Sequence, residues 1–211
     1  MRHFEDGGRK NAAVANYFAR MGRDNPLAAM ERAAALPQSM RQEVMNRLAR
    51  EWAQRAPQGF VDFLKAASDP ASQAALARAG FRELGNRGGG DEYLAEALAL
   101  PEGRAKEEAV TALFSGWSQV NLETSSHALD GMARGPLRDA AIAAFVSNAA
   151  EIDRAAALAW SLDIDDPQRR RATTRRQAQS WLRSDPAAAT RWIEASEAMP
   201  GEWKAELLGE R

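Results

Sequence analysis

The chain has 211 residues, of which 45% are hydrophobic and 27% are charged. This composition is typical of a folded globular protein, and the length fits one domain or two small ones. With 28 basic and 29 acidic residues the net charge is −1, which excludes an overall attraction to nucleic acid or to an anionic membrane. The absence of cysteine excludes disulfides, thiol nucleophiles and thiolate metal sites.

Alanine is abundant and β-branched residues are few, so the local preference of the chain is helical and an all-α fold is predicted. No apolar run has the length of a signal peptide or of a membrane span. We therefore expect a cytoplasmic protein without membrane insertion, or a periplasmic one if a signal segment has been removed. Residues 1–10 are expected to form a flexible tail, 11–208 a single helical domain and 209–211 a short C-terminal tail.

Helix starts recur along the chain in two interleaved series. Proline fits the first turn of a helix, and Asp or Asn before the first turn caps the free backbone N–H groups. One series steps by 31 to 35 residues through Pro37, Pro70, Pro101, Pro136, Pro167 and Pro200. The other lies between them, at Pro26, Pro57, Asp91, Asn121, Asp153 and Pro186. Two series with one period predict a helix pair in each repeat of about 33 residues.

Large aromatic residues follow the same period. One falls near the end of the second helix of each repeat, at Phe18, Trp52, Phe81, Trp117, Phe145 and Trp181. First helices carry another at Phe63, Trp160 and Trp192. Because each pair must cover its apolar side with its neighbours, we interpret these aromatics as core residues rather than as a binding cage.

The clearest junction between repeats is SWLRSDPAAATRW at 180–192, where Trp181 ends one pair and Asp185-Pro186 begins the next. Its pattern, Trp-x3-Asp-Pro-x-Ala-Ala-x2-Trp, resembles degenerate alanine-rich helical repeats of bacterial proteins in the tetratricopeptide and HEAT-like class. The resemblance implies a right-handed α-solenoid of about six antiparallel helix pairs, with a concave face suited to binding. Helices at about 11–22 and 201–209 are expected to cap its ends.

The sequence offers no constellation for catalysis, a metal or a cofactor. His3 falls in the predicted tail, and His127 follows Ser125 and Ser126 on a helix, where neighbouring side chains point in different directions. The glycine-rich stretch at 85–94 lacks the Gly-Lys-Ser/Thr of a phosphate loop, so we interpret it as a connector between helices. We therefore expect a protein that is not an enzyme.

The strongest local charge lies in the arginine-rich segment at 166–183. On a helix, Arg169, Arg176 and Arg183 form one row opposite the apolar side and should face solvent, whereas Arg171 and Arg175 flank that side and could pair with acids of an adjacent helix. We take Arg169, Arg175, Arg176 and Arg183 as candidate binding residues. Three interpretations stay open: solvated or internally paired arginines, an acidic protein partner, and nucleic acid.

A further set of arginines follows the prolines that start second helices, where a positive charge opposes the helix dipole: Arg41, Arg104, Arg138 and Arg171. We expect each to pair with a carboxylate on the preceding repeat. Trp203, near the C-terminus, is expected to be exposed and is the candidate contact of a homodimer.

These observations favour a non-enzymatic scaffold that holds a protein or peptide on its concave face. The first alternative is nucleic-acid binding through the helix at 166–183. The second is a superhelical accessory domain of a larger cell-envelope enzyme, which would explain a chain without catalytic residues.

Overall fold

The computed structural model describes residues 13–14, 16–67 and 69–209, which form helices and contain no strand. The all-α prediction is therefore confirmed for this part of the chain. The expected tail at 1–10 and the last two residues of the chain lie outside it. Residues 16–24 are helical and precede α2.

The helices alternate in length. Short helices of 9 or 10 residues are α2 (Pro26–Ala34), α4 (Pro57–Ala66), α6 (Gly90–Leu98), α8 (Leu122–Gly131), α10 (Arg154–Leu162) and α12 (Pro186–Ala195). Long helices of 17 or 18 residues are α3 (Gln38–Arg55), α5 (Pro70–Asn86), α7 (Arg104–Val120), α9 (Pro136–Ile152) and α11 (Pro167–Ser184). The last helix, α13 (Gly201–Leu208), has 8 residues. The short helices begin 31 to 33 residues apart, which agrees with the predicted period.

Asparagine and aspartate side chains cap six of the twelve helices from α2 to α13. The side chains of Asn25, Asp69, Asn121, Asp153, Asp166 and Asp185 each accept a hydrogen bond from the backbone N–H three residues later. All six were predicted as caps or helix starts. Helix α6 differs, because it begins at Gly90 after Gly89, which has no side chain to cap it, and Asp91 lies inside its first turn.

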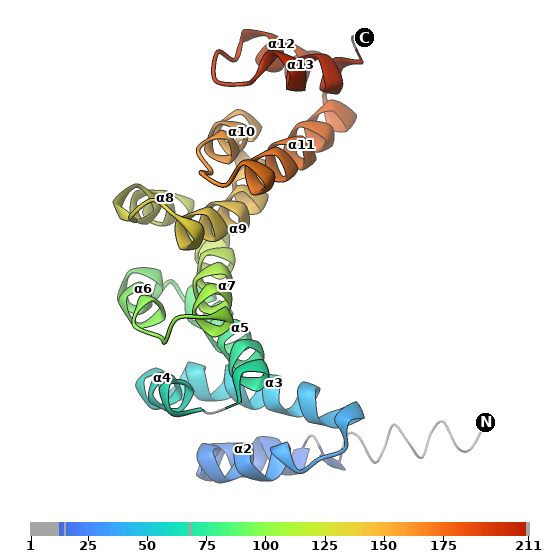
Figure 1. Cartoon of the computed structure of the whole chain (residues 1–211). Helices are drawn as coiled ribbons and strands as arrows, with labels where there is room; N and C mark the ends of the chain where they lie inside the picture. Colours follow the sequence, from blue (N-terminus) through green and yellow to red (C-terminus); the bar gives the residue numbers. More distant parts are fainter. Residues whose placement is uncertain (1–12, 15, 68, 210–211) are drawn as a thin grey trace, which may run out of the picture. The chain divides into compact units, whose positions relative to one another are not determined.

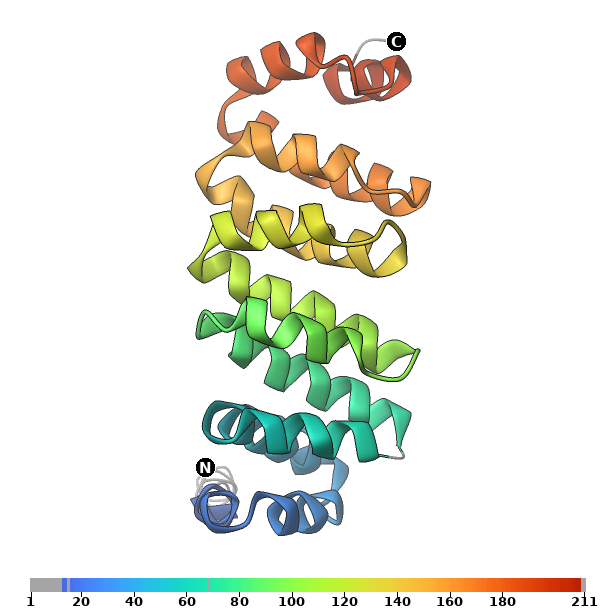
Figure 2. The ribbon, with the colours of Figure 1, turned by 90° about the vertical axis from the view of Figure 1, so that its left-hand side faces the viewer.

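The described chain divides into two compact units, Met1–Gly116 and Trp117–Arg211. In unit 1, α3 packs against α2, α4 and α5, and α5 packs against α4 and α6. The short helices α4 and α6 lie on one side of α3 and α5 (Figures 1 and 2). Aromatic rings in edge-on and tilted contact join these layers: the ring centroid of Phe60 lies 6.3 Å from that of Trp52 and 6.5 Å from that of Phe81. Gly80 makes room for Phe60, since a Cβ at this position would lie 2.2 Å from its ring.

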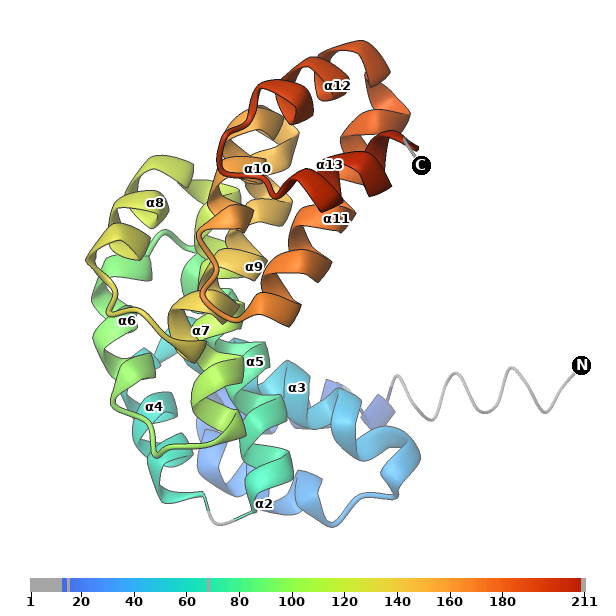
Figure 3. The ribbon, with the colours of Figure 1, turned by 45° about the horizontal axis from the view of Figure 1, so that its top comes forward.

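In unit 2, α9 packs against α8, α10 and α11, and α11 packs against α10, α12 and α13. Figure 3 shows α13 beside α11. The predicted core aromatics Trp117 and Phe145 are buried, whereas Trp160, Trp181 and Trp192 are half-buried. Trp181 and Trp192, the two tryptophans of the predicted junction, contact each other with 6.2 Å between their ring centroids. Trp203 is only 9% exposed, so the prediction that it forms an exposed contact is wrong.

No helix in the described part of the chain has both the length and the apolar character needed to cross a membrane.

Candidate binding surface on α11

Helix α11 carries six arginines and no acidic residue. Asp166 starts it by accepting the N–H of Arg169, and its buried side consists of Thr173, Thr174, Gln177 and Ala178. The hydroxyl of Thr174 lies 2.9 Å from that of Ser161 on α10, so this polar side is hydrogen-bonded inside the unit. The buried threonines leave the arginines on the remaining sides of the helix.

The start of α11 is held by a network of charged residues at the preceding loop. Asp139, which is 2% exposed, accepts the backbone N–H groups of Asp165 and Asp166 at 2.8 Å each. Arg138, which is 5% exposed, donates to the carbonyl of Leu129 and to the carboxylate of Asp163. The buried charges of this network are thus hydrogen-bonded, and they fix where α11 begins.

Arg134 completes this network from the surface. Its guanidinium bridges the carboxylates of Asp163 at 2.8 Å and Asp165 at 2.5 Å. Burial raises the pKa of Asp163, but hydrogen bonds from Arg138 and Arg134 outweigh burial, so the pKa of this carboxyl lies below its usual range. We interpret the network as structural, because its arginines pair with Asp163 and Asp165 and its buried Asp139 accepts two backbone N–H groups.

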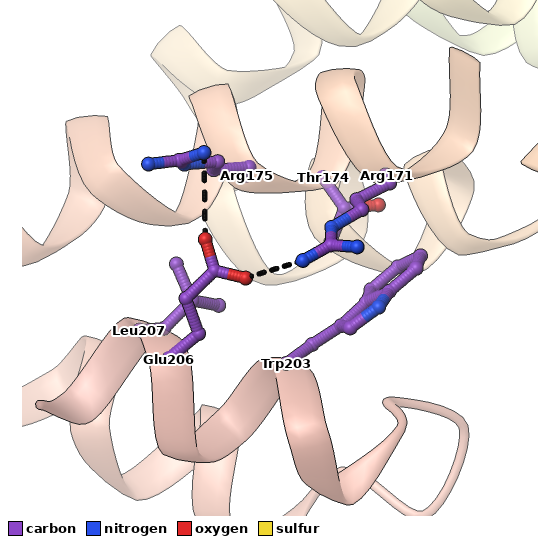
Figure 4. Close-up of a pocket in the computed structure, with 6 residues that line it drawn as sticks. All are labelled: Arg171, Thr174, Arg175, Trp203, Glu206 and Leu207. Carbon is purple, nitrogen blue, oxygen red and sulfur yellow. Dashed lines mark hydrogen bonds and ion pairs between the residues drawn. The ribbon is translucent and has the colours of Figure 1, made fainter. Parts of the chain in front are cut away.

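Arg171 and Arg175 hold α13 against α11. The carboxylate of Glu206 on α13 lies 2.8 Å from Arg171 and 3.4 Å from Arg175, and the hydrogen bond from Arg171 lowers the pKa of Glu206. Trp203 lies beside Arg171, and Trp203, Glu206 and Leu207 of α13 line a small hollow with Arg171, Thr174 and Arg175 of α11 (Figure 4). Internal pairing, one of the interpretations left open for these two arginines, is therefore confirmed.

The row of Arg169, Arg176 and Arg183 lies on a different side of α11. Arg169 is half-buried and donates from Nη1 to the carbonyl of Pro136 on α9, at 3.3 Å, so it does not project into solvent as predicted. Arg176 and Arg183 follow at steps of seven residues, about two helical turns, and are exposed. Among the residues that the structure describes, no carboxylate lies within 4 Å of either. We call Arg176 and Arg183 the α11 arginine pair.

Ion pairs to another element form as predicted at Arg138 and Arg171, but the expectation that the carboxylates lie on the preceding repeat is wrong. Arg138 pairs with Asp163 and Arg171 with Glu206, and both carboxylates lie later in the chain. Arg104 pairs with Glu108 in its own helix, and Arg41 donates to the carbonyl of Leu36. The four arginines near the starts of long helices, where a positive charge is unfavourable, therefore have no kind of partner in common.

A second hollow, of about 660 Å³ with the solvent at its mouth, lies in unit 1 where α3 and α5 end and α4 and α6 begin. Arg55, Arg87 and Glu92 line it beside Tyr93. Arg87 donates to the carbonyl of Gln54, and burial, followed by the hydrogen bond with Glu92, raises the pKa of Tyr93. Both arginines lie at helix C-termini, where a cation opposes the negative end of the dipole, so we interpret them as structural.

The described residues contain no group of three His, Asp or Glu side chains that could hold a metal ion. His127 is exposed, and Ser125 and Ser126 beside it donate to backbone carbonyls of their own helix. Reasoning from the sequence missed Glu206 and Asp163 as partners of arginines, and Asp139 as the acceptor of two backbone N–H groups before α11. The acids are visible in the sequence, but nothing local to them signals which partner each would meet.

A scan against models of known protein families and searches of curated proteins and of solved structures find no match to the chain.

Proposed function

We propose that the protein is a binding scaffold built from helical repeats, and that the exposed side of α11 holds an acidic segment of a protein partner. The finer architecture proposed with it is a right-handed α-solenoid of about six antiparallel helix pairs, with a concave face that receives the partner. The regular alternation of short and long helices, each pair about 32 residues after the last, supports this architecture.

The observation that carries the proposed function is the α11 arginine pair. The helix has six positive charges and no negative one, and on the side of α13 Glu206 neutralises Arg171 and Arg175. Arg176 and Arg183 remain exposed, and the planar guanidinium binds carboxylates in a bidentate geometry. An acidic partner would therefore supply the carboxylates that the fold does not provide for these two guanidinium groups.

Fluorescence anisotropy with a labelled peptide of glutamates and glycines tests the proposal. The wild-type chain should bind it, and Arg176→Glu with Arg183→Glu should weaken binding by about tenfold, since each exposed pair contributes up to ~1 kcal/mol. The matched control is Arg50→Glu with Arg82→Glu, which makes the same change of charge at exposed positions of the long helices α3 and α5. Equal loss in both double variants would contradict a specific surface on α11.

Nucleic acid is the second candidate, and the concentration of six arginines on one helix favours it. A labelled single-stranded DNA of the same net charge as the peptide separates the two functions. Binding that is steeply salt-dependent and tighter than that of the peptide would favour nucleic acid. The described exposed side chains around the arginine pair are not aromatic, so base stacking is missing there and the acidic protein segment is the better fit.

Three predictions rest on the sequence alone. They are that the chain is an accessory domain of a larger cell-envelope enzyme, that it is cytoplasmic or periplasmic, and that it forms a homodimer.

A further inference from the structure

The hollow of unit 1, where α3 and α5 end and α4 and α6 begin, has a positively charged lining. Its volume of about 660 Å³, open to solvent at the mouth, falls within the range of small-molecule sites, about 300–1,000 Å³. Arg55 and Arg87 line it together with one acid, Glu92. Among the residues that the structure describes, no carboxylate forms an ion pair with either arginine. The lining therefore has one more positive than negative charge, and both guanidinium groups are without an anionic partner.

The two arginines meet at the end of α3. Arg87 follows Asn86, the last residue of α5, and donates from Nη1 to the backbone carbonyl of Gln54, which directly precedes Arg55. The charge of each arginine has a structural role, because it opposes the dipole at a helix C-terminus. A guanidinium has five N–H donors, however. The other donors of Arg87, and those of Arg55, have no acceptor in the described part of the chain.

The two short helices that begin at the hollow lack a side-chain cap. Ala56 precedes α4 and Gly89 precedes α6, and neither has a side chain that accepts a hydrogen bond. The other short helices that the structure describes, α2, α8, α10 and α12, each begin after a capping Asn or Asp. Free backbone N–H groups at a helix start favour an anion. The helix starts therefore agree with the arginines in the charge that they favour at this hollow.

Tyr93 gives the hollow an aromatic wall beside the arginines. Its ring packs closely on the backbone of Gly89, since a Cβ at Gly89 would lie 2.8 Å from Cε2 of the ring. Burial and Glu92 raise the pKa of Tyr93, whereas the charge of Arg87 acts in the opposite direction. The phenol and the guanidinium are therefore near each other. Together with Pro57, the ring offers an apolar surface next to the unpaired donors.

We propose that this hollow binds a small organic anion, with its carboxylate or phosphate group between Arg55 and Arg87 and its apolar part against Tyr93. Guanidinium groups bind both kinds of oxyanion through charge-assisted hydrogen bonds. Glu92 repels a second anionic group, so the ligand has its negative charge at one end. The site lies within unit 1 and does not depend on the proposed function of α11.

Phenyl phosphate and benzoate test the site with the full chain. In NMR titrations, both should shift the ring signals of Tyr93 and the Nε–H signal of Arg55, and the tighter of the two identifies the preferred oxyanion. Inorganic phosphate should bind about tenfold more weakly than phenyl phosphate, because it has no apolar part to remove from water. Equal affinity for these two phosphates, or no shift with either organic probe at about 10 mM, would overturn the inference.

Arg55→Gln should weaken the binding of phenyl phosphate by about tenfold, the loss of one charge-assisted contact. The variant should fold, because Arg55 is exposed and makes no hydrogen bond within the described chain. Arg50→Gln is the matched control, since it makes the same change at another exposed position of α3, and it should leave the affinity unchanged. Equal weakening in both variants would overturn the inference, because only the overall charge would then matter.

The same variants separate this site from the α11 surface. Arg55→Gln should leave binding of the glutamate-glycine peptide intact, and Arg176→Glu with Arg183→Glu should leave binding of phenyl phosphate intact. Loss of phenyl phosphate binding in that double variant would place the probe on α11 and overturn the inference, while the proposed function would stand.

Discussion

Arg138 of α9 donates a hydrogen bond from Nη2 to Oδ2 of Asp163, the residue that ends α10, and the two atoms lie 2.5 Å apart. The guanidinium is almost fully buried and also donates to the carbonyl of Leu129, while its carbon lies 5.9 Å from the ring centroid of Trp160. One side chain of α9 thus ties together the end of α8 and the loop before α11.

Arg138→Leu should lower the free energy of unfolding by about 2 kcal/mol, because it leaves the carbonyl of Leu129 without its donor and removes a buried partner of Asp163. Arg134→Leu is the control, since this side chain is 63% exposed and its ion pairs, screened by solvent, should contribute less than the buried one. Urea denaturation of the two variants measures both values. Equal losses would show that burial of Arg138 adds nothing to its interaction with Asp163.

Asp139→Asn should loosen the loop before α11. The carboxylate accepts two backbone N–H groups, from Asp165 and Asp166, and an asparagine can accept only through one oxygen while its NH₂ faces the second N–H. We expect the free energy of unfolding to fall by about 1–3 kcal/mol in Asp139→Asn. Hydrogen exchange of the two amides should accelerate in the variant, and unchanged protection of both would contradict the account of how α11 is positioned.

The contact of α13 with α11 should weaken in acid. The pKa of Glu206 is lower in the folded chain than in the unfolded one, so the stabilisation is present above the unfolded pKa of about 4.3 and is lost as pH falls through the folded pKa. Glu206→Gln should mimic the acid form at neutral pH. The indole N–H resonance of Trp203, followed by NMR, should shift in the variant at pH 7 and in the wild type only on acidification. A variant spectrum identical to that of the wild type at pH 7 would contradict this role of Glu206.

Gly116→Ala should destabilise unit 1 by about 1–3 kcal/mol, as overpacking does. A Cβ on Gly116 would lie 2.5 Å from the backbone carbonyl oxygen of Arg82, which cannot move as a side chain can. Gly131→Ala, at the end of α8, has no atom within 4 Å of its added Cβ and serves as the control. Thermal unfolding should show a lowered Tm for Gly116→Ala only.

The sequence predicts the helices well because their starts depend on short-range interactions. The caps at Asn121, Asp153 and Asp185 each bond to a backbone N–H three residues away, and proline or an Asx residue signals them directly. The burial of Trp117 and Phe145 is also predictable, because large aromatics that recur with the period of the helix starts are expected to pack in the core.

The partners of the arginines depend on distant residues and were predicted poorly. Glu206 reaches Arg171 from 35 residues away, and this contact requires α13 to lie back along α11. The expectation that Trp203 is exposed fails for the same reason, because the sequence of a short last helix does not indicate which other helix it packs against. The identity of a residue is visible in the sequence, but the contact it makes across the fold is not.

The exposed side of α11 is tested most directly by the side-chain resonances of its arginines. In NMR spectra of the Nε–H groups, addition of the glutamate-glycine peptide should shift the signals of Arg176 and Arg183, while those of Arg50 and Arg82 should stay in place. Shifts confined to Arg171 and Arg175 would show that the peptide only displaces α13. Arg176 and Arg183 signals unchanged at saturating peptide would contradict the proposal that this surface binds an acidic partner.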